Sequence, residues 1–153
     1  MRESRAAYLR HQHDASQADL EYRAVLRSKP ATVEPFFEAA EFYENQRNAN
    51  GLRNAVEAAA GMEPSDPRLS YFGGVLNIIA GANPSQGEAL LTAYLVVPPR
   101  SDRPSAASAH EWLGRLYEQT GSSPRAIDQY RAALALEPGR KSAKESLRRL
   151  GQP

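Results

Sequence analysis

Three histidines, His11, His13 and His110, are the side chains in this sequence best suited to hold a metal ion or move a proton. His11 and His13 are two positions apart, so a helix turns them to different faces, and the chain has no cysteine to complete a metal site. Ser108, His110 and Glu111 are the residue types of a catalytic triad, but close neighbours on one helix cannot converge on one atom. We therefore expect no metal site, no cofactor and no catalytic centre.

A row of glutamates has more chemical content, because Glu34, Glu38, Glu41 and Glu44 are spaced by three and four positions. On a helix this spacing places four like charges on one face, where each pair repels by roughly a few tenths of a kcal/mol. Such a face is either solvated or complementary to a cationic partner. The row does not predict acid–base catalysis, since one straight helix provides no opposing wall.

A repeat of 34 residues predicts the elements that position these side chains. Pro30, Pro64 and Pro98 are 34 positions apart, and Pro138 follows after 40. Three other columns keep the same steps, and they are Ala6, Ala40, Gly74 and Gly114; Tyr22, Val56, Leu90 and Tyr130; and Val25, Ala59, Ala93 and Ala133. A fixed period of this length is typical of stacked helix–turn–helix units.

Four helical pairs and one further helix fit this period and its punctuation. The nine expected helices cover about 2–13, 17–28, 34–45, 51–61, 67–80, 85–96, 107–120, 124–136 and 141–150. Gly81 and Gly121 are predicted to end first helices in the left-handed conformation. Serines followed three positions later by an acidic residue are predicted to cap helix starts, and these are Ser16, Ser85, Ser108 and Ser142.

Small residues are predicted where the helices of a pair cross closely. Gly74 and Gly114 mark this contact on first helices. The corresponding residues on second helices are Ala18, Ala59, Ala93, Ala126 and Ala133.

The fourth unit resembles the tetratricopeptide repeat through Trp112-Leu113-Gly114, Tyr117, Gly121, Ala126, Tyr130, Ala133 and Pro138. The resemblance covers about residues 3–140. It implies an all-α, right-handed solenoid of antiparallel helix pairs in a single domain, 1–153. Its repeats are about 1–32, 33–66, 67–100 and 107–140, followed by a capping helix at 141–150.

The resemblance also implies that the first helix of each pair lines a concave groove. Helical spacing then selects Glu34, Phe37, Glu38, Glu41, Glu44 and Asn45 in the second unit, Arg68, Tyr71, Phe72, Val75, Ile78 and Ile79 in the third, and Ser108, Glu111, Trp112, Arg115, Glu118 and Gln119 in the fourth. The first unit adds Glu3, Ala7, Arg10 and His11. The apolar set of the third unit has two interpretations: it is the floor of the groove, or it belongs to a helix covered by its neighbours.

Two segments fall outside the repeat. Six extra residues between Pro98 and Ala107 predict a surface loop, interpreted as a tolerated insertion in preference to a ligand-gripping loop. The basic segment 140–150 is interpreted as a capping helix in preference to a contact with nucleic acid or a membrane.

The composition limits the classes of partner that we expect. The chain of 153 residues has 19 basic and 18 acidic side chains, a balance that argues against nucleic acid. It shows neither a signal peptide nor an apolar run long enough to span a membrane, so we expect a cytoplasmic chain without membrane contact. We predict a non-catalytic module that binds a protein or peptide with basic and apolar side chains in its groove. Self-association through the apolar face of the third unit is the alternative, and an enzyme is the least favoured hypothesis.

Overall fold

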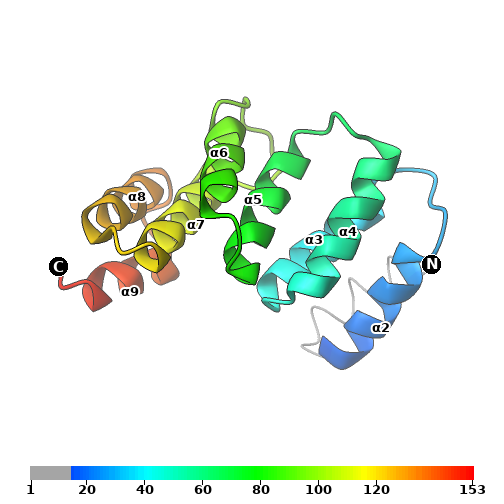
Figure 1. Ribbon diagram of the computed structural model, residues 1–153, viewed down its shortest axis with the longest axis horizontal. Coiled ribbons are helices and arrows are strands. Elements are labelled where there is room, and N and C mark those ends of the chain that lie inside the picture. Colours follow the sequence, from blue (N-terminus) through cyan, green and yellow to red (C-terminus); the bar gives the residue numbers. More distant parts are fainter. Residues whose placement is uncertain (1–14) are drawn as a thin grey trace. The chain divides into compact units, whose positions relative to one another are not determined.

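The computed structural model describes residues 15–153, and in that range the chain forms eight helices and no strand (Figure 1). The helices are α2 (Ala15–Leu26), α3 (Glu34–Asn45), α4 (Ala49–Met62), α5 (Arg68–Ala80), α6 (Pro84–Leu95), α7 (Ala106–Gln119), α8 (Ser123–Leu136) and α9 (Lys141–Arg149). All eight were predicted from the sequence, with ends that differ by two residues at most. The other expected helix, 2–13, lies outside the described residues.

Contacts within the chain divide it into two compact units, one ending at Phe72 and the other beginning at Gly73. The boundary lies inside α5, which belongs to the third predicted repeat. A single continuous domain stays a prediction.

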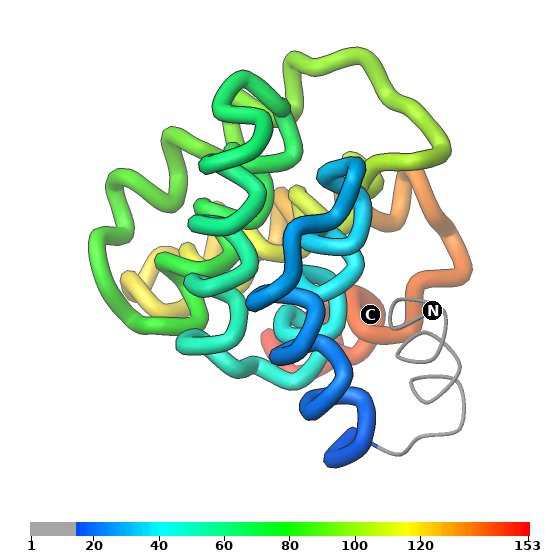
Figure 2. The backbone as a smooth tube through the Cα atoms, turned by 90° about the vertical axis from the view of Figure 1, so that its right-hand side faces the viewer, coloured from blue at the N-terminus to red at the C-terminus, as the bar shows by residue number. Residues whose placement is uncertain are grey.

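In the first unit, α2, α3 and α4 lie side by side (Figures 1 and 2). Their core contains Tyr22 of α2 and Phe42 of α3, whose ring centroids are 5.0 Å apart. Gly51 allows the start of α4 to approach Tyr43, because a Cβ atom at this position would lie 2.3 Å from the Cδ1 atom of that ring. This close approach was not predicted.

In the second unit, glycines mark the crossings of first and second helices, as the repeat predicts. A Cβ atom at Gly114 of α7 would lie 2.6 Å from Tyr130 Cε1 of α8. At Gly74 of α5 it would lie 2.6 Å from Leu91 Cγ of α6. Ala93 was also predicted at a crossing and is exposed instead, because α6 turns Leu91 and Gly87 toward α5.

Three first helices end in the same way, at positions that fit the predicted 34-residue period. Arg47, Gly81 and Gly121 have positive φ angles of 54°, 64° and 78°. In each case the next residue donates its N–H to a carbonyl five positions back, as in the Schellman motif, and these bonds are Asn48 to Tyr43, Ala82 to Asn77 and Ser122 to Tyr117. The steps between the three ends are 34 and 40 residues, the steps of the proline column.

Most helix starts differ from the predicted capping boxes. Asn48 caps α4 by accepting the Gly51 N–H at 2.9 Å, and Ser105 caps α7 by accepting the Ser108 N–H at 3.1 Å. Asn83 and Arg140 hold the capping positions of α6 and α9. The predictions for Ser85, Ser108 and Ser142 are therefore wrong, because each helix begins before its serine. Ser16 likewise lies inside α2.

Candidate interaction surfaces

The acidic row lies on α3 in the first unit, where Arg68 interacts with one end of it. Arg68 Nη1 lies 2.6 Å from Glu34 Oε2, and its Nη2 lies 2.7 Å from Asp66 Oδ2. Hydrogen bonds to Asp66 and to Glu34 raise the pKa of Arg68 above its ordinary value, although burial opposes them. The guanidinium also lies 4.0 Å from the ring centroid of Phe37. Arg68, predicted as a groove residue, is therefore a buried link between α3 and the start of α5.

Three aromatic residues predicted for the groove belong to the core. Phe37 of α3 stacks on Phe72 of α5 with ring centroids 5.8 Å apart, and Tyr71 meets Phe72 edge-on at 5.0 Å. Tyr71 donates its hydroxyl hydrogen to Glu44 Oε1 at 2.6 Å. Since at most 5% of any of these three residues is exposed, they position α3 and have little surface to offer a partner.

The carboxylates of α3 remain at the surface to different degrees. Glu34 and Glu41 are exposed, and Glu38 and Glu44 are half-buried. All four interact with other groups of the chain. Because α3 contains no lysine or arginine, the helix presents a face with accessible negative charge, which we call the acidic face of α3.

The apolar residues of the third repeat, predicted for the groove floor, are mostly buried. Val75 and Ile78 have 0% and 2% of their surface exposed, and Ile79 is half-buried. Together with Tyr71 and Phe72, they fit the interpretation of α5 as a covered helix rather than an exposed groove floor. The sequence could not separate these interpretations, because an apolar helix face has the same composition in both.

Glu111, the predicted groove carboxylate of the fourth repeat, holds α9 against α7. It is 2% exposed, and it accepts hydrogen bonds from Arg115 at 3.0 Å and from Arg140. Arg140 also donates to Glu137 at 2.6 Å and to Ser108 at 2.7 Å. Burial raises the pKa of Glu111, but hydrogen bonds with Ser142 and Arg140 and the charges of Arg115 and Arg140 outweigh it, so the pKa lies below its ordinary value.

Trp112 and Arg115 form a second structural pair on α7. Trp112 is 5% exposed, and the Arg115 guanidinium carbon lies 4.5 Å from its ring centroid. Arg115 is half-buried, with 26% of its side chain accessible. Of the predicted groove residues of α7, Arg115 therefore offers more surface than Glu111 or Trp112.

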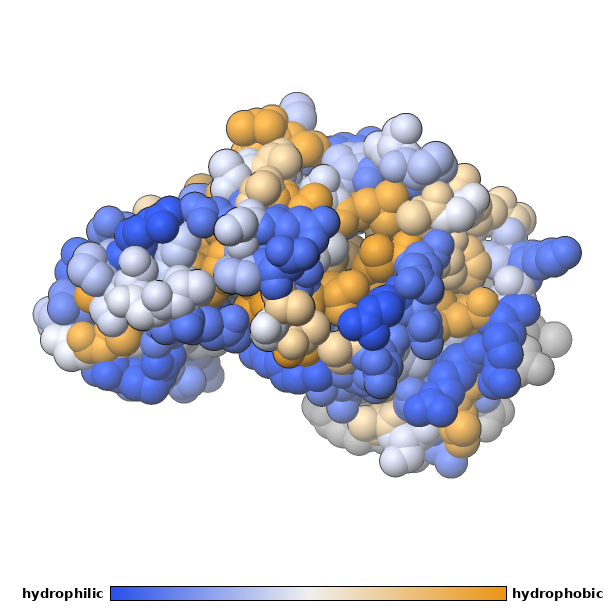
Figure 3. All heavy atoms as spheres, in the orientation of Figure 1, coloured by the Kyte–Doolittle hydropathy of each residue, from blue (hydrophilic) through white to orange (hydrophobic). Residues whose placement is uncertain are grey.

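The basic C-terminal segment forms α9, which packs on α8. Its inner face contains Ala143 and Leu147, and Arg149 is bonded to Glu118 of α7. The surface over this helix is largely hydrophilic (Figure 3). These contacts fit the interpretation of 141–150 as a capping helix, and its place at the end of a four-repeat array stays a prediction.

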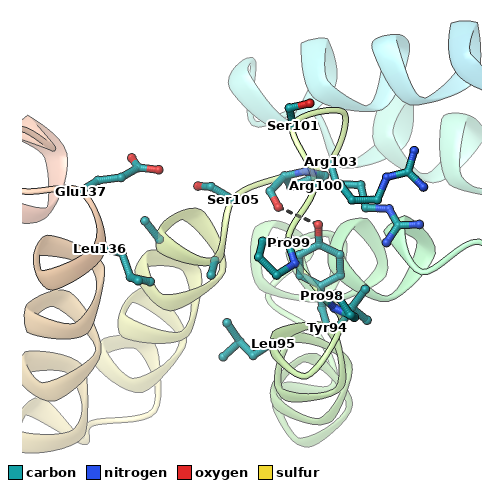
Figure 4. Close-up of a pocket in the computed structure, with 14 residues that line it drawn as sticks. Tyr94, Leu95, Pro98, Pro99, Arg100, Ser101, Arg103, Ser105, Leu136 and Glu137 are labelled. Carbon is teal, nitrogen blue, oxygen red and sulfur yellow. Dashed lines mark hydrogen bonds between the residues drawn. The ribbon is translucent and has the colours of Figure 1, made fainter.

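A cleft beside the six-residue insertion was not predicted from the sequence. Its volume is about 520 Å³, and its walls come from the end of α6, the loop 98–105, the start of α7 and the end of α8. Leu95 and Leu136 lie on opposite walls (Figure 4). The insertion itself was the available signal, since the other joints of the repeat lack it.

Other kinds of site find little support in residues 15–153. No group of three or more His, Asp or Glu side chains there could hold a metal ion. His110 Nδ1 lies 2.8 Å from Gln129 Oε1, while His11 and His13 lie outside the described residues. Nor does any described helix combine the length and apolarity needed to span a membrane. The first-unit groove residues Glu3, Ala7, Arg10 and His11 also lie outside the described residues.

The helical pairs define a class of fold, the all-α solenoid of antiparallel helix pairs. The crystal structure of MamA is similar to this chain, with a TM-score of 0.62 and 20% sequence identity over 90% of this chain and 77% of the MamA chain. No protein-family model matches the sequence. A search of curated proteins likewise gave no match. The likeness to MamA supports the predicted fold class, an α-solenoid of helix pairs.

Proposed function

We propose that this chain is a non-catalytic protein-interaction module whose acidic face of α3 binds a basic segment of a partner protein. The observation that carries the proposal is the row of Glu34, Glu38, Glu41 and Glu44 on a helix without a basic residue. Helical arrays present such faces in series, which suits them to bind extended segments. The similarity in fold to MamA is consistent with this role and does not identify the partner.

The contacts that these carboxylates already make are compatible with binding a cation. An ionised carboxylate has about four acceptor positions, so Glu34 can keep its bonds to Arg68 and accept from a partner as well. Its side chain is 57% exposed, which leaves room for this approach. A lysine or arginine of the partner would also reduce the repulsion along α3.

Of the originally predicted groove, the accessible members carry the proposal. Glu34, Glu38, Glu41 and Glu44 contribute charge, and Ile79 and Arg115 contribute half-buried surface. The buried members act indirectly by holding the helices in place, and these are Phe37, Arg68, Tyr71, Phe72, Val75, Ile78, Glu111 and Trp112. One groove that joins all these positions stays a prediction.

Charge reversal on α3 tests the proposal. We expect the double variant Glu38→Lys/Glu41→Lys to weaken binding of a fluorescent peptide containing lysine, arginine and one leucine by about tenfold or more, because charged hydrogen bonds contribute about 1.5–3 kcal/mol each. Fluorescence anisotropy at low and physiological salt measures the affinity, which should fall as salt rises. Glu38→Gln/Glu41→Gln should give a smaller loss.

A matched control separates the effect of the acidic face on binding from the effect of net charge. Glu57→Lys/Glu63→Lys changes the net charge equally through two exposed glutamates outside α3. This variant should retain most of the affinity. Equal losses in both double variants, or undiminished binding by the α3 variant, would contradict a specific role for the acidic face.

A further inference from the structure

The cleft beside the loop 98–105 has walls that are fixed before anything binds. Tyr94 is 5% exposed and donates its hydroxyl hydrogen to the Pro104 carbonyl oxygen at 2.6 Å (Figure 4). At the end of the loop, Ser105 caps α7. Pro98, Pro99 and Pro104 restrict the backbone between these two anchors. A wall that is already ordered reduces the entropy lost when a ligand binds.

Apolar side chains are exposed around this cleft. Leu136 is 56% exposed in its wall, and Val96, between the wall residues Leu95 and Val97, is 82% exposed. They are two of the four large apolar residues that are exposed in the described part of the chain. Hydrophobic atoms reach the surface at the end of α6 that leads into the loop (Figure 3). An apolar side chain of a ligand would bury this surface favourably.

The charges that border the cleft leave one cation without a described partner. Arg100 pairs with Asp102 at 2.8 Å, and Glu137 pairs with Arg140 at 2.6 Å. The side chain of Arg103 makes no hydrogen bond or ion pair with another residue in the described range. Both loop guanidinium groups extend from the side of the loop that faces away from Leu136 (Figure 4). A segment that fills the cleft and crosses the loop would therefore meet positive charge.

We propose that this cleft docks a partner-protein segment that inserts one apolar side chain between Leu95 and Leu136 and places a carboxylate on Arg103. The volume of about 520 Å³ suits this ligand, since pockets for small ligands span about 300–1,000 Å³. The site differs from the acidic face of α3 in its residues and in the charge that it selects. It therefore does not depend on the function proposed above.

Selection from a displayed library of random linear peptides, with the full chain as bait, tests this proposal. Enriched peptides should share an apolar residue close to aspartate or glutamate. The fluorescent consensus peptide should bind saturably, and Leu136→Asp and Arg103→Glu should each weaken it by about tenfold or more, as expected when a buried contact or a charge pair is lost. Both variants should keep the melting temperature of the wild type, because neither side chain is buried.

Two matched variants serve as controls. Leu20→Asp changes a leucine of α2 that is 59% exposed, and Arg131→Glu changes an exposed arginine of α8. Both should bind the consensus peptide like the wild type. Enriched peptides without a carboxylate, or equal losses in test and control variants, would overturn the proposal. So would a wild-type dimer in light scattering that Leu136→Asp dissociates, because the occupant would then be a second copy of the chain.

Discussion

At the scale of single residues, three first helices end in the left-handed conformation, and at one of these ends the residue is not glycine. Arg47 has a φ angle of 54°, in the register position where Gly81 and Gly121 stand. A residue with a side chain is less stable in the left-handed region by about 1–2 kcal/mol, whereas glycine adopts this region readily. Arg47 is therefore strained in the left-handed conformation that ends α3 at the position expected from the 34-residue period.

This strain predicts the relative stability of two variants. Arg47→Gly should be more stable than Arg47→Ala by about 1 kcal/mol, because glycine adopts a positive φ angle without the steric strain that alanine has there. Comparing the two variants removes the contribution of the arginine contacts, which both lack. Urea unfolding followed by circular dichroism measures the difference. An alanine variant as stable as the glycine variant would exclude strain at this position.

Individual residues differ in how far their surroundings could be predicted from the sequence. The role of Gly74 and Gly114 at close helix crossings was predictable, because such a crossing leaves no room for a side chain whatever surrounds it. The state of Tyr71, Val75 and Glu111 was not, because burial depends on which elements cover a face. A helical pattern identifies the face of a residue, and only the assembled core shows whether solvent reaches it.

At the scale of elements, helix bounds were predictable because several local signals agree on them. Pro124 falls in the first turn of α8, as expected, and Gly81 and Gly121 end α5 and α7. Pro84, expected in the loop before α6, is instead the first residue of that helix. The capping serines were assigned wrongly because the four-residue pattern also occurs inside helices, as Ser108 does in α7. The cleft was missed because an insertion reveals only a loop, and the packing of Leu95 and Leu136 around it does not follow from sequence spacing.

The attachment of α9 predicts a dependence on pH. Glu111 has a lowered pKa in the folded chain, so its stabilising contribution is present above the ordinary glutamate pKa of about 4.3 and is lost as the pH falls through its folded value. Glu118 follows the same sign, since the Arg149 hydrogen bond lowers its pKa more than burial raises it. The wild type should therefore lose stability steeply on acidification below about pH 4.5.

The variant Glu111→Gln measures how much the bonds of Glu111 to Arg115 and Arg140 contribute to stability and to its pH dependence. The free energy of unfolding at pH 7 should fall by about 2 kcal/mol, because charged hydrogen bonds from Arg115 and Arg140 are weakened while both arginines stay in place. The loss of stability between pH 6 and pH 3 should be smaller in this variant than in the wild type. Glu145→Gln, at an exposed position of α9, serves as the control. If both variants lose stability equally with acid, Glu111 does not hold α9.

At the scale of the whole molecule, repeated use of one packing solution connects sequence, fold and function. Small residues at a recurring position allow paired helices to nest, and the nested pairs leave other helix faces accessible to partners. The acidic face of α3 and the cleft beside the loop 98–105 are two such surfaces, for which we propose partners of opposite charge. Both require that the paired helices keep their close contact.

Three glycine-to-alanine variants test this close contact most directly. Gly74→Ala and Gly114→Ala should lower the free energy of unfolding by about 1–3 kcal/mol, because the added methyl groups meet buried side chains at 2.6 Å and overpack the crossings. Gly61→Ala, in a helix with nothing within 4 Å of the new methyl group, should raise it by about 0.5–1 kcal/mol through helix propensity. Denaturant unfolding of the three variants and the wild type gives the signs. We expect two losses and one gain, and a gain in all three variants would contradict close helix crossings at Gly74 and Gly114.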